Sequence, residues 1–431
     1  MVVQQWGYKM EGLINKYRTE QFYFSTPGYE LLVDGKFRKI ICEKTQEIPH
    51  IITELQKSGT LKGKIVVGTL PFNINEAPIL YLAEKWKKQE FPFMQRKIKF
   101  IDDVMKNDVE LFGFNPTPEK YKEMVRKATE YIKKGELNKL VLSRGVELQL
   151  LKNPDIKLIL LKLYQNNEEG YTYSVPIGNR AVLLGASPEM LVSKRGNSIF
   201  SNPLAGSRKR GSNISEDSAM AKELKESLKD KREHKFVVDN IVEKISKICD
   251  EIYSSPIPEV ISTKRLWHLS SVIRGRLKNT ELTALDAALK IYPTPAVCGV
   301  PQEIAYEKIL ELEGQGRGFF TGLVGWCDEN GNGDWAIAIR GAEIRGKNVT
   351  IKVALRSDTG SHRADVAVHA GQAGVRRHRG ADQQPERAVP LFHQAPHPPL
   401  RQGHQRRGRF LRLNHKLQLN QGIRASLSKG V

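Results

Sequence analysis

The sequence has few cysteines, few aromatic residues and no long apolar segment. Its four cysteines are far apart and lack metal-ligand spacing, which fits reduced thiols used as small apolar residues rather than a disulfide or zinc framework. No run of about 18 apolar residues occurs, and the first residues show no basic stretch followed by an apolar one. We therefore expect no membrane span, no secretory signal, and a globular, cytoplasmic protein without a membrane partner.

The sequence also has fewer acidic than basic residues, which gives a net charge of +20. Such a charge ordinarily indicates a nucleic-acid or membrane-surface partner. Its distribution argues against one here. Residues 1–353 carry 54 Lys+Arg and 44 Asp+Glu, a net +10, and the last 78 residues carry the other +10. The excess positive charge is concentrated at the C-terminal end.

Residue usage changes abruptly near position 353. There are 38 Lys and 16 Arg before it, but 2 Lys and 12 Arg after it, together with seven of the ten histidines. The tail, 354–431, shows no sustained strand or helix period, so we expect it to be disordered or poorly structured. Its composition favours a frameshifted or foreign coding segment. The alternative is a basic arm for nucleic acid or anionic lipid, which no aromatic-interleaved patch supports.

Residues 1–353 alternate between strand-like and helix-like segments. The expected strands are 64–70, 139–148 and a hairpin pair, 319–327 and 335–340, and the expected helices are 118–134 and 215–252. No internal linker rich in Gly, Ser or Pro interrupts this part. We therefore predict a single large α+β domain of mostly antiparallel sheet packed with helices.

Glu233 begins the apolar stripe of the helix predicted over 215–252. Positions 233, 237, 241, 245 and 248 share one helix face, and the last four are Val or Ile. A buried carboxylate needs an arginine, a hydrogen-bond network or a cation, because burial without a partner is costly. Metal binding is thus one interpretation, and a solvent-facing helix end or a salt bridge is the other.

Lys139 opens the strand predicted at 139–148, where Val141, Ser143 and Gly145 share its face. In a partly apolar cleft a lysine loses proton affinity and becomes a usable general base near neutral pH. The alternative is an ordinary exposed strand lysine.

Glu189 follows Ser187-Pro188, where the proline fixes the backbone before the carboxylate. A carboxyl group in a low-polarity pocket stays protonated and donates a proton to a leaving hydroxyl group. The alternative is an exposed acid in a turn.

Three further features suit an anionic ligand. The Pro/Gly loop 203–207 is expected to present backbone amides, and Arg340 is expected to end a strand with Ala336 and Ala338 on its face, which leaves room for a carboxylate. An ordinary surface ion pair is the alternative for Arg340. His268 is either a satisfied core histidine or a ligand contact.

Several ordered segments together resemble the chorismate-utilising enzymes, and among them the isochorismate synthase branch. The matching segments are Lys-Leu-Val-Leu-Ser-Arg at 139–144, Gly-Ala-Ser-Pro-Glu at 185–189, Pro-Leu-Ala-Gly-Ser at 203–207, Lys-Arg-Glu-His at 231–234, Leu-Trp-His-Leu at 266–269, Tyr-Pro-Thr-Pro-Ala-Val-Cys-Gly at 292–299, and 322–327 with Ile339 and Arg340. The resemblance spans about residues 10–353. It implies a chorismate-binding domain and a magnesium-dependent, reversible isomerase that converts chorismate to isochorismate.

The resemblance also implies a role for each candidate residue. Lys139 would be the base that activates water, Glu189 the acid that protonates the departing hydroxyl group, and Glu233 a ligand of Mg²⁺. The substrate-binding residues implied are Gly206 and Ser207 for the ring carboxylate, Arg340 for the pyruvyl carboxylate, His268 and Ala296. The product would serve siderophore or menaquinone biosynthesis, and we expect a monomer. Salicylate synthase, or an inactive chorismate-binding or basic-tailed interaction protein, is the alternative.

The resemblance ends near residue 353. The family continues there into a glycine-rich turn, an acidic segment whose Trp and Glu supply the second magnesium ligand, and a substrate-binding lysine. The tail holds a single glutamate, Glu386, without a neighbouring Trp, and its two lysines are Lys416 and Lys429. We therefore expect weak magnesium binding and low activity of this chain.

Overall fold

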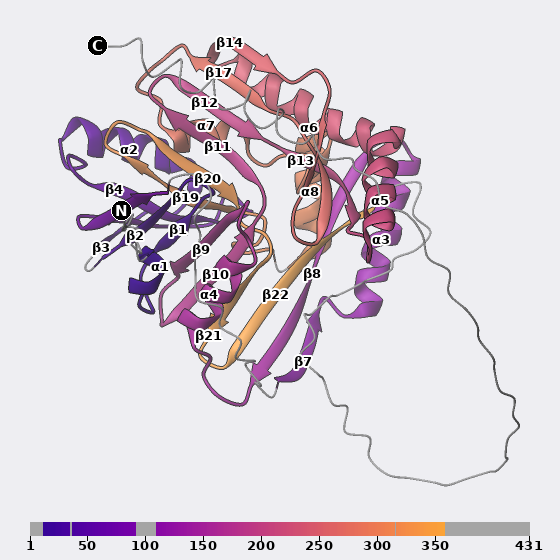
Figure 1. Cartoon of the computed structure of the whole chain (residues 1–431), viewed down its shortest axis with the longest axis horizontal. Helices are drawn as coiled ribbons and strands as arrows, with labels where there is room; N and C mark the ends of the chain where they lie inside the picture. Colours follow the sequence, from indigo (N-terminus) through magenta and orange to yellow (C-terminus); the bar gives the residue numbers. More distant parts are fainter. Residues whose placement is uncertain (1–11, 35–36, 92–108, 315, 358–431) are drawn as a thin grey trace, which may run out of the picture. The chain divides into compact units, whose positions relative to one another are not determined.

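Two large sheets form the framework of the structure (Figure 1). The computed structural model describes residues 12–34, 37–91, 109–314 and 316–357. Every pairing between the described strands is antiparallel. The prediction of an α+β fold built mostly on antiparallel sheet is therefore confirmed.

The ten-stranded sheet contains the strand that begins with Lys139. Its strands, in spatial order, are β18 (Gly299–Val300), β8 (Lys139–Leu150), β22 (Asn348–Ser357), β21 (Gly341–Arg345), β10 (Ala181–Ser187), β9 (Tyr171–Pro176), β1 (Tyr23–Ser25), β2 (Tyr29–Val33) and β6 (Trp86–Glu90), with β7 (Val109–Asn115) also paired to β8. Figure 1 shows β8 and β22 as long neighbouring strands, and their register runs from Asn348 opposite Gln149 to Ser357 opposite Leu140.

The nine-stranded sheet and a small three-stranded sheet complete the strands. The nine strands are β14 (Cys249–Ser254), β17 (Ile273–Leu277), β12 (Ser198–Asn202), β11 (Met190–Arg195), β20 (Gly333–Ile337), β19 (Leu323–Asp328), β4 (Ile65–Leu70), β5 (Ile79–Ala83) and β3 (Phe37–Ile40). The three strands are β13 (Leu204–Lys209), β16 (Leu266–Ser270) and β15 (Glu259–Ser262).

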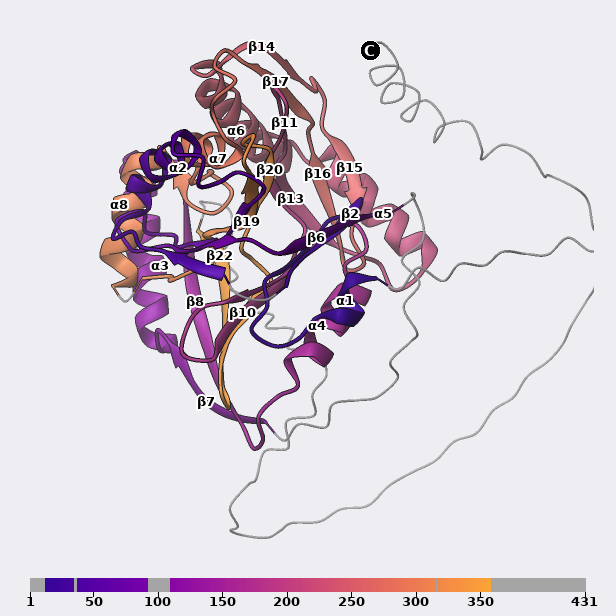
Figure 2. The ribbon, with the colours of Figure 1, turned by 90° about the vertical axis from the view of Figure 1, so that its left-hand side faces the viewer.

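The described helices lie on the outer faces of the sheets. They are α1 (Leu13–Lys16), α2 (Ile48–Lys57), α3 (Pro118–Lys133), α4 (Ile156–Gln165), α5 (Ile214–Glu226), α6 (Leu228–Ser246), α7 (Ala284–Ile291) and α8 (Gln302–Glu313), with a 3₁₀ turn at Thr45–Glu47. Helices α3 and α8 contact β8 and lie beside it in Figure 2. No described helix has both the length and the apolar character needed to cross a bilayer.

The core has three parts. One cluster fills the space between the two large sheets, with Phe24 and Tyr173 contributed by the first sheet and Val67 and Trp326 by the second. A second cluster packs α1 and α4 on the outer face of the first sheet. The third joins α2, α3, α6, α7 and α8 to the second sheet and to β8. The four cysteines are free thiols and three of them are buried, as their spacing predicted.

The strands predicted at 64–70 and 139–148 and the helix predicted at 118–134 are present as β4, β8 and α3. The hairpin is present as β19 and β20, which are shorter than predicted. Strand β22 continues through Ser357, because it remains paired with β8 beyond residue 353. The described residues all fall within one compact unit, Met1–Val375. The prediction for the rest of the tail concerns 358–431, which lie outside the described residues.

The prediction of one helix over 215–252 is wrong at two points. Ser227 has a non-helical backbone (φ −63°, ψ 108°), and its side chain accepts a hydrogen bond from the Asp230 N–H, so it ends α5 and caps α6. Residues Cys249–Ser254 form β14, because pairing with β17 overrides their local preference. The predicted apolar stripe is confirmed within α6, where Glu233, Val237 and Ile241 are buried.

A buried ion pair ties α8 to the inner strands. Arg317 is fully buried, and its guanidinium donates to Glu313 (2.7 Å) and to the carbonyl groups of Val297 (2.7 Å) and Val141. Glu313 also accepts the backbone N–H and the hydroxyl of Ser143, each at 2.8 Å. The pair therefore joins α8, β8 and the segment before β18.

Replacing Glu313 by Leu should destabilise the protein strongly, because it leaves the Arg317 guanidinium buried without its carboxylate. Breaking one side of a buried pair costs about 3–5 kcal/mol. The free energy of unfolding, measured with urea, should fall by that amount. The control is Glu311→Gln on the same helix, where an exposed pair with Lys308 should change the value by less than about 0.5 kcal/mol. Equal losses in the two variants would contradict the role given to the buried pair.

Candidate active site

Lys139 and Glu233 meet although 94 positions separate them. Lys139 is the first residue of β8, and Glu233 lies in the second turn of α6. The Lys139 Nζ is 3.1 Å from Glu233 Oε1, and the two side chains are 6% and 10% exposed. The interpretations of Lys139 as an exposed strand lysine and of Glu233 as a solvent-facing helix end are therefore wrong. The pair matches the buried salt bridge that the sequence left open.

Glu189 is a buried carboxyl group in the connection between β10 and β11. Its backbone N–H donates to the Ser187 hydroxyl (3.1 Å), and its carbonyl accepts from Ile337 N–H (3.1 Å), so the residue is fixed between the two large sheets. Burial raises its pKa to about 7, although Lys139, the Leu204 N–H and Arg340 each act to lower that pKa. Near neutral pH the group is therefore partly protonated, as an acid catalyst requires.

The segment 203–207 is a bulged strand start rather than the predicted loop. Leu204–Lys209 form β13, whose register with β16 skips Gly206, so that Ser207 lies opposite His268. Gly206 has φ +78°, and a Cβ at this position would come within 3.1 Å of Asp230 Cβ and 3.3 Å of Leu269 Cδ1. A glycine is required here for both backbone conformation and space.

The sequence predicted that Arg340 ends a strand, but in the structure it does not. Strand β20 stops at Ile337, and Arg340 adopts φ +53° in the turn that carries the chain to β21 in the other sheet. Its carbonyl accepts the Ala186 N–H (3.0 Å), which holds this turn against β10. The predicted shared face with Ala336 and Ala338 is therefore wrong. Burial lowers the pKa of the Arg340 guanidinium.

His268 links two of the predicted residues. It is 5% exposed, with its Nδ1 2.7 Å from Ser207 Oγ and its Nε2 3.3 Å from Arg340 Nη2. Burial, and then the charge of Arg340, lower its pKa to about 4, so the ring is neutral near pH 7. Ser207, His268 and Arg340 thus form one hydrogen-bonded chain.

Ala296 lies in the connection between α7 and β18. It is half-buried and packs against the core cluster that contains Leu140 and Cys298. The connection that contains Ala296 is tied to the strand of Lys139, because the Val141 N–H donates to the Cys298 carbonyl (2.8 Å). The predicted contact of Ala296 with substrate stays a prediction.

Sequence reasoning missed three buried polar groups near the site. Asp230, one turn before Glu233, accepts from Arg208 (2.8 Å), and His234 shares a hydrogen bond with Ser271 (2.8 Å). Burial lowers the pKa of His234 to about 4. The third is Arg317. The 231–234 motif was the available signal for His234. For Arg317 the available signal was Glu313 four residues earlier, a spacing that also suits an ordinary surface ion pair.

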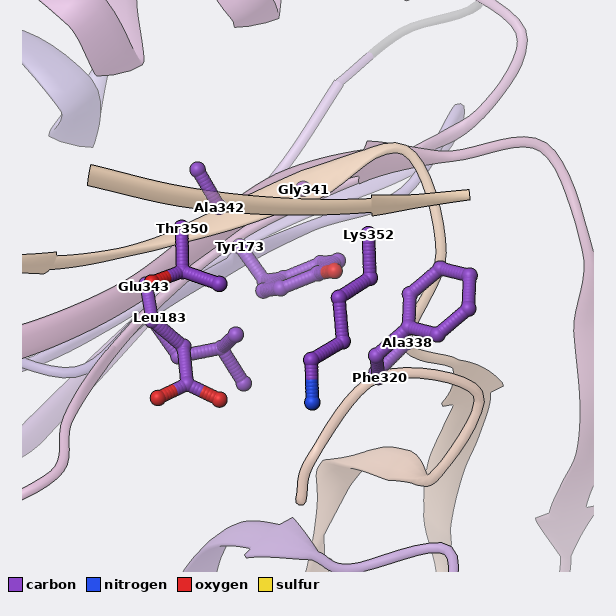
Figure 3. Close-up of a pocket in the computed structure, with 9 residues that line it drawn as sticks. All are labelled: Tyr173, Leu183, Phe320, Ala338, Gly341, Ala342, Glu343, Thr350 and Lys352. Carbon is purple, nitrogen blue, oxygen red and sulfur yellow. The ribbon is translucent and has the colours of Figure 1, made fainter. Parts of the chain in front are cut away.

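A separate hollow lies over β21 and β22 on the side of the second sheet. Figure 3 shows Lys352 and Glu343 extending to the same side of the strands, with Phe320 beside them. Its lining residues are Tyr173, Leu183, Phe320, Ala338, Gly341, Ala342, Glu343, Thr350 and Lys352. None of the eight predicted site residues lines it. Lys352 donates to the Gly316 carbonyl (3.3 Å).

Glutamine at position 189 should remove a pH dependence from the stability. The folded protein binds the Glu189 proton more tightly than the unfolded chain, so the wild type loses stability as the pH rises from about 4.5 to about 7. The free energy of unfolding of Glu189→Gln relative to wild type should therefore rise by about 2.5 kcal/mol between pH 5 and 8. Urea unfolding at several pH values measures it.

Glu136→Gln is the control, because this exposed carboxyl group is hydrated in both states. Its stability relative to wild type should not change with pH. The same flat profile for Glu189→Gln would contradict the assigned burial effect.

The chain resembles known proteins in sequence and in fold. The sequence profile described as "chorismate binding enzyme" matches residues 74–352. Isochorismate synthase DhbC of Bacillus subtilis is 36% identical over 365 residues, which cover 80% of this chain and 89% of that protein. The crystal structure of DhbC from Bacillus anthracis has a TM-score of 0.74 at 34% identity and covers 81% of this chain and 93% of that one. MenF from Escherichia coli, at 18% identity and a TM-score of 0.66, shares the fold; the matched regions are 79% of this chain and 83% of MenF.

Proposed function

Because this chain belongs to the chorismate-binding enzyme family, we propose that it is an isochorismate synthase of the siderophore type. The activity named for the Bacillus subtilis relative supports the proposal. The observation that carries it is a buried lysine, Lys139, that acts electrostatically on a second buried group, the Glu189 carboxyl group, whose pKa burial raises to about 7. Such a pair suits a reaction that takes a proton from one oxygen and gives a proton to another.

In this reaction the oxygen of a water molecule bonds to one ring carbon of chorismate, and the hydroxyl group on another ring carbon leaves as water. The Lys139 amine accepts a proton from the attacking water. The Glu189 carboxyl group donates its proton to the departing hydroxyl group, so substrate and product have the same composition. Lys139 accepts a proton only in its neutral form, so it must first lose the proton that it holds in its ion pair with Glu233.

The remaining residues would bind the two carboxylates. The guanidinium of Arg340 suits the pyruvyl carboxylate, because it donates two parallel hydrogen bonds. Gly206 and Ser207 lie at the bulge of β13 and would donate to the ring carboxylate. His268 and Ala296 would complete the substrate site. Arg340 and Glu189 influence each other's pKa, which supports one shared site.

Glu233 fits a magnesium ligand by its donor chemistry. Mg²⁺ prefers oxygen and is often held by one or two carboxylates together with substrate and waters. Among the described residues no group of three or more His, Cys, Asp or Glu side chains is arranged to hold a metal ion. Glu233 would thus be the ligand from this part of the chain. A bound ion there would supply the positive charge that anchors the ring carboxylate.

Turnover of chorismate with saturating Mg²⁺ tests the proposal, with products separated by chromatography. We expect isochorismate, whereas salicylate with pyruvate would indicate a salicylate synthase. Lys139→Arg keeps a positive charge for Glu233 but stays protonated. Loss of the base should lower kcat by about 10²–10⁴-fold in both Lys139→Arg and Lys139→Ala. Near-normal turnover of Lys139→Arg would contradict the base role.

We also propose that the chain as it stands turns over slowly, because the tail lacks the Trp-Glu segment and lysine that the resemblance implies. A second chain, with a family-like segment replacing residues from 354 onward, should be faster at saturating Mg²⁺ and should need less Mg²⁺ for half-maximal rate. Glu233→Gln in both chains is the control, and it should abolish the difference. Equal rates of the two parent chains would contradict the proposal.

A further inference from the structure

The chain of hydrogen bonds from Arg340 through His268 to Ser207 determines where protons lie, as well as where side chains lie. We infer that His268 is a positioning residue that holds the Ser207 hydroxyl as a hydrogen-bond donor directed towards a substrate carboxylate. The inference rests on the proposed function for the identity of the substrate. The side-chain hydroxyl of Ser207 would then act in addition to its backbone amide.

The direction of the hydrogen bonds follows from the chemistry of arginine. A guanidinium group donates hydrogen bonds and accepts none. Since Arg340 Nη2 lies 3.3 Å from His268 Nε2, this ring nitrogen must be the acceptor. A neutral ring then carries its proton on Nδ1, which lies 2.7 Å from Ser207 Oγ and donates to it. The single hydroxyl proton of Ser207 is left to bond elsewhere.

The other protonation states are disfavoured by the same contacts. A proton on Nε2 would face an N–H group of Arg340, whether the ring were neutral or charged. It would also leave Nδ1 as an acceptor in the neutral ring, so that Ser207 would donate inward and turn its lone pairs towards an anionic ligand. The buried position of His268, 5% exposed, adds to the cost of a charged ring.

Backbone geometry fixes both ends of this chain. The bulge at Gly206 places Ser207 directly opposite His268 in the β13–β16 ladder, so that the two side chains meet across the strands. At the other end, Arg340 adopts a φ of +53°. Its carbonyl accepts a hydrogen bond from the Ala186 N–H (3.0 Å), which holds the turn in place. The backbone thus sets the positions of both residues that bond to His268.

Ser207 is exposed, so a ligand can reach its hydroxyl group. An exposed serine ordinarily rotates and offers either a proton or lone pairs to its neighbours. Because the Nδ1–H of His268 occupies one lone pair of the Ser207 oxygen, the hydroxyl presents its proton outward. A hydroxyl group that can only donate at this position favours a carboxylate over a group that must itself donate.

Nitrogen-15 NMR of the histidine rings in the full chain tests the tautomer without any need for activity. The His268 signals are identified by their loss in His268→Asn. We expect a protonated Nδ1 and an unprotonated Nε2 from pH 6 to 8. A protonated Nε2, in a neutral or a charged ring, would overturn the inference.

Chorismate binding, measured by calorimetry, tests the action through Ser207. Ser207→Ala removes the donor and should raise the dissociation constant at least about tenfold, as expected for a hydrogen bond to a charged group. His268→Gln should raise it similarly and add little in the Ser207→Ala background, because both changes remove one interaction. Fully additive losses would overturn the positioning role. Ser262→Ala on β15 of the same sheet is the control and should bind like wild type.

The two measurements also separate this inference from the proposed function. If the wild-type chain binds no chorismate, the proposed function fails and the donor role of Ser207 fails with it, while the NMR result still decides the tautomer of His268. If chorismate binds and Ser207→Ala binds equally well, the inference alone is overturned.

Discussion

The ion pair between Glu313 and Arg317 holds the strand that carries Lys139 against the segment that carries Ala296. The Arg317 guanidinium reaches the carbonyl groups of Val141 and Val297, and the Glu313 carboxylate receives the backbone N–H of Ser143. These groups are fully buried or nearly so, so each needs its partner. The start of β8 is thus fixed from within, and the Lys139 side chain is held there against Glu233 of α6.

The site itself balances buried charge of both signs. Lys139 and Glu233 form a pair, Arg340 is held by His268, and Glu189 lies under the influence of the cations. Because burial outweighs those cations, the pKa of Glu189 rises to about 7 rather than falling. The two large sheets bring these groups together, since Lys139 belongs to the first sheet and Glu189 precedes the second. Their spacing therefore depends on how the sheets pack.

Local patterns in the sequence predicted the elements with strong periodicity. The helix at 118–134, the strands at 64–70 and 139–148 and the buried stripe of Glu233, Val237 and Ile241 are present, because a single amphipathic or β-forming pattern decides each one. The predictions failed where tertiary contacts decide. Ser227 interrupts a continuous helical pattern by capping, and Arg340 leaves the strand because the chain must cross between sheets.

The candidate residues were predictable chiefly because their neighbours in sequence formed recognisable motifs. Ion-pair and hydrogen-bond partners far away in the chain were not predictable, since Lys139 and Glu233, or Ser207, His268 and Arg340, meet only in the folded chain. Arg317 illustrates the limit, because its spacing from Glu313 is also that of an ordinary surface pair, and its bonds to the Val141 and Val297 carbonyls leave no pattern in the sequence.

The long ladder between β8 and β22 has a consequence for synthesis on the ribosome. Strand β8 begins at Lys139, but its partner begins only at Asn348, about 200 residues later, which take roughly 10–40 s to translate at ~5–20 residues per second. Throughout that interval one edge of the lysine strand lacks its native partner and can recruit a wrong one. A nascent chain of this kind gains from a chaperone that shields the edge until the last described strand emerges.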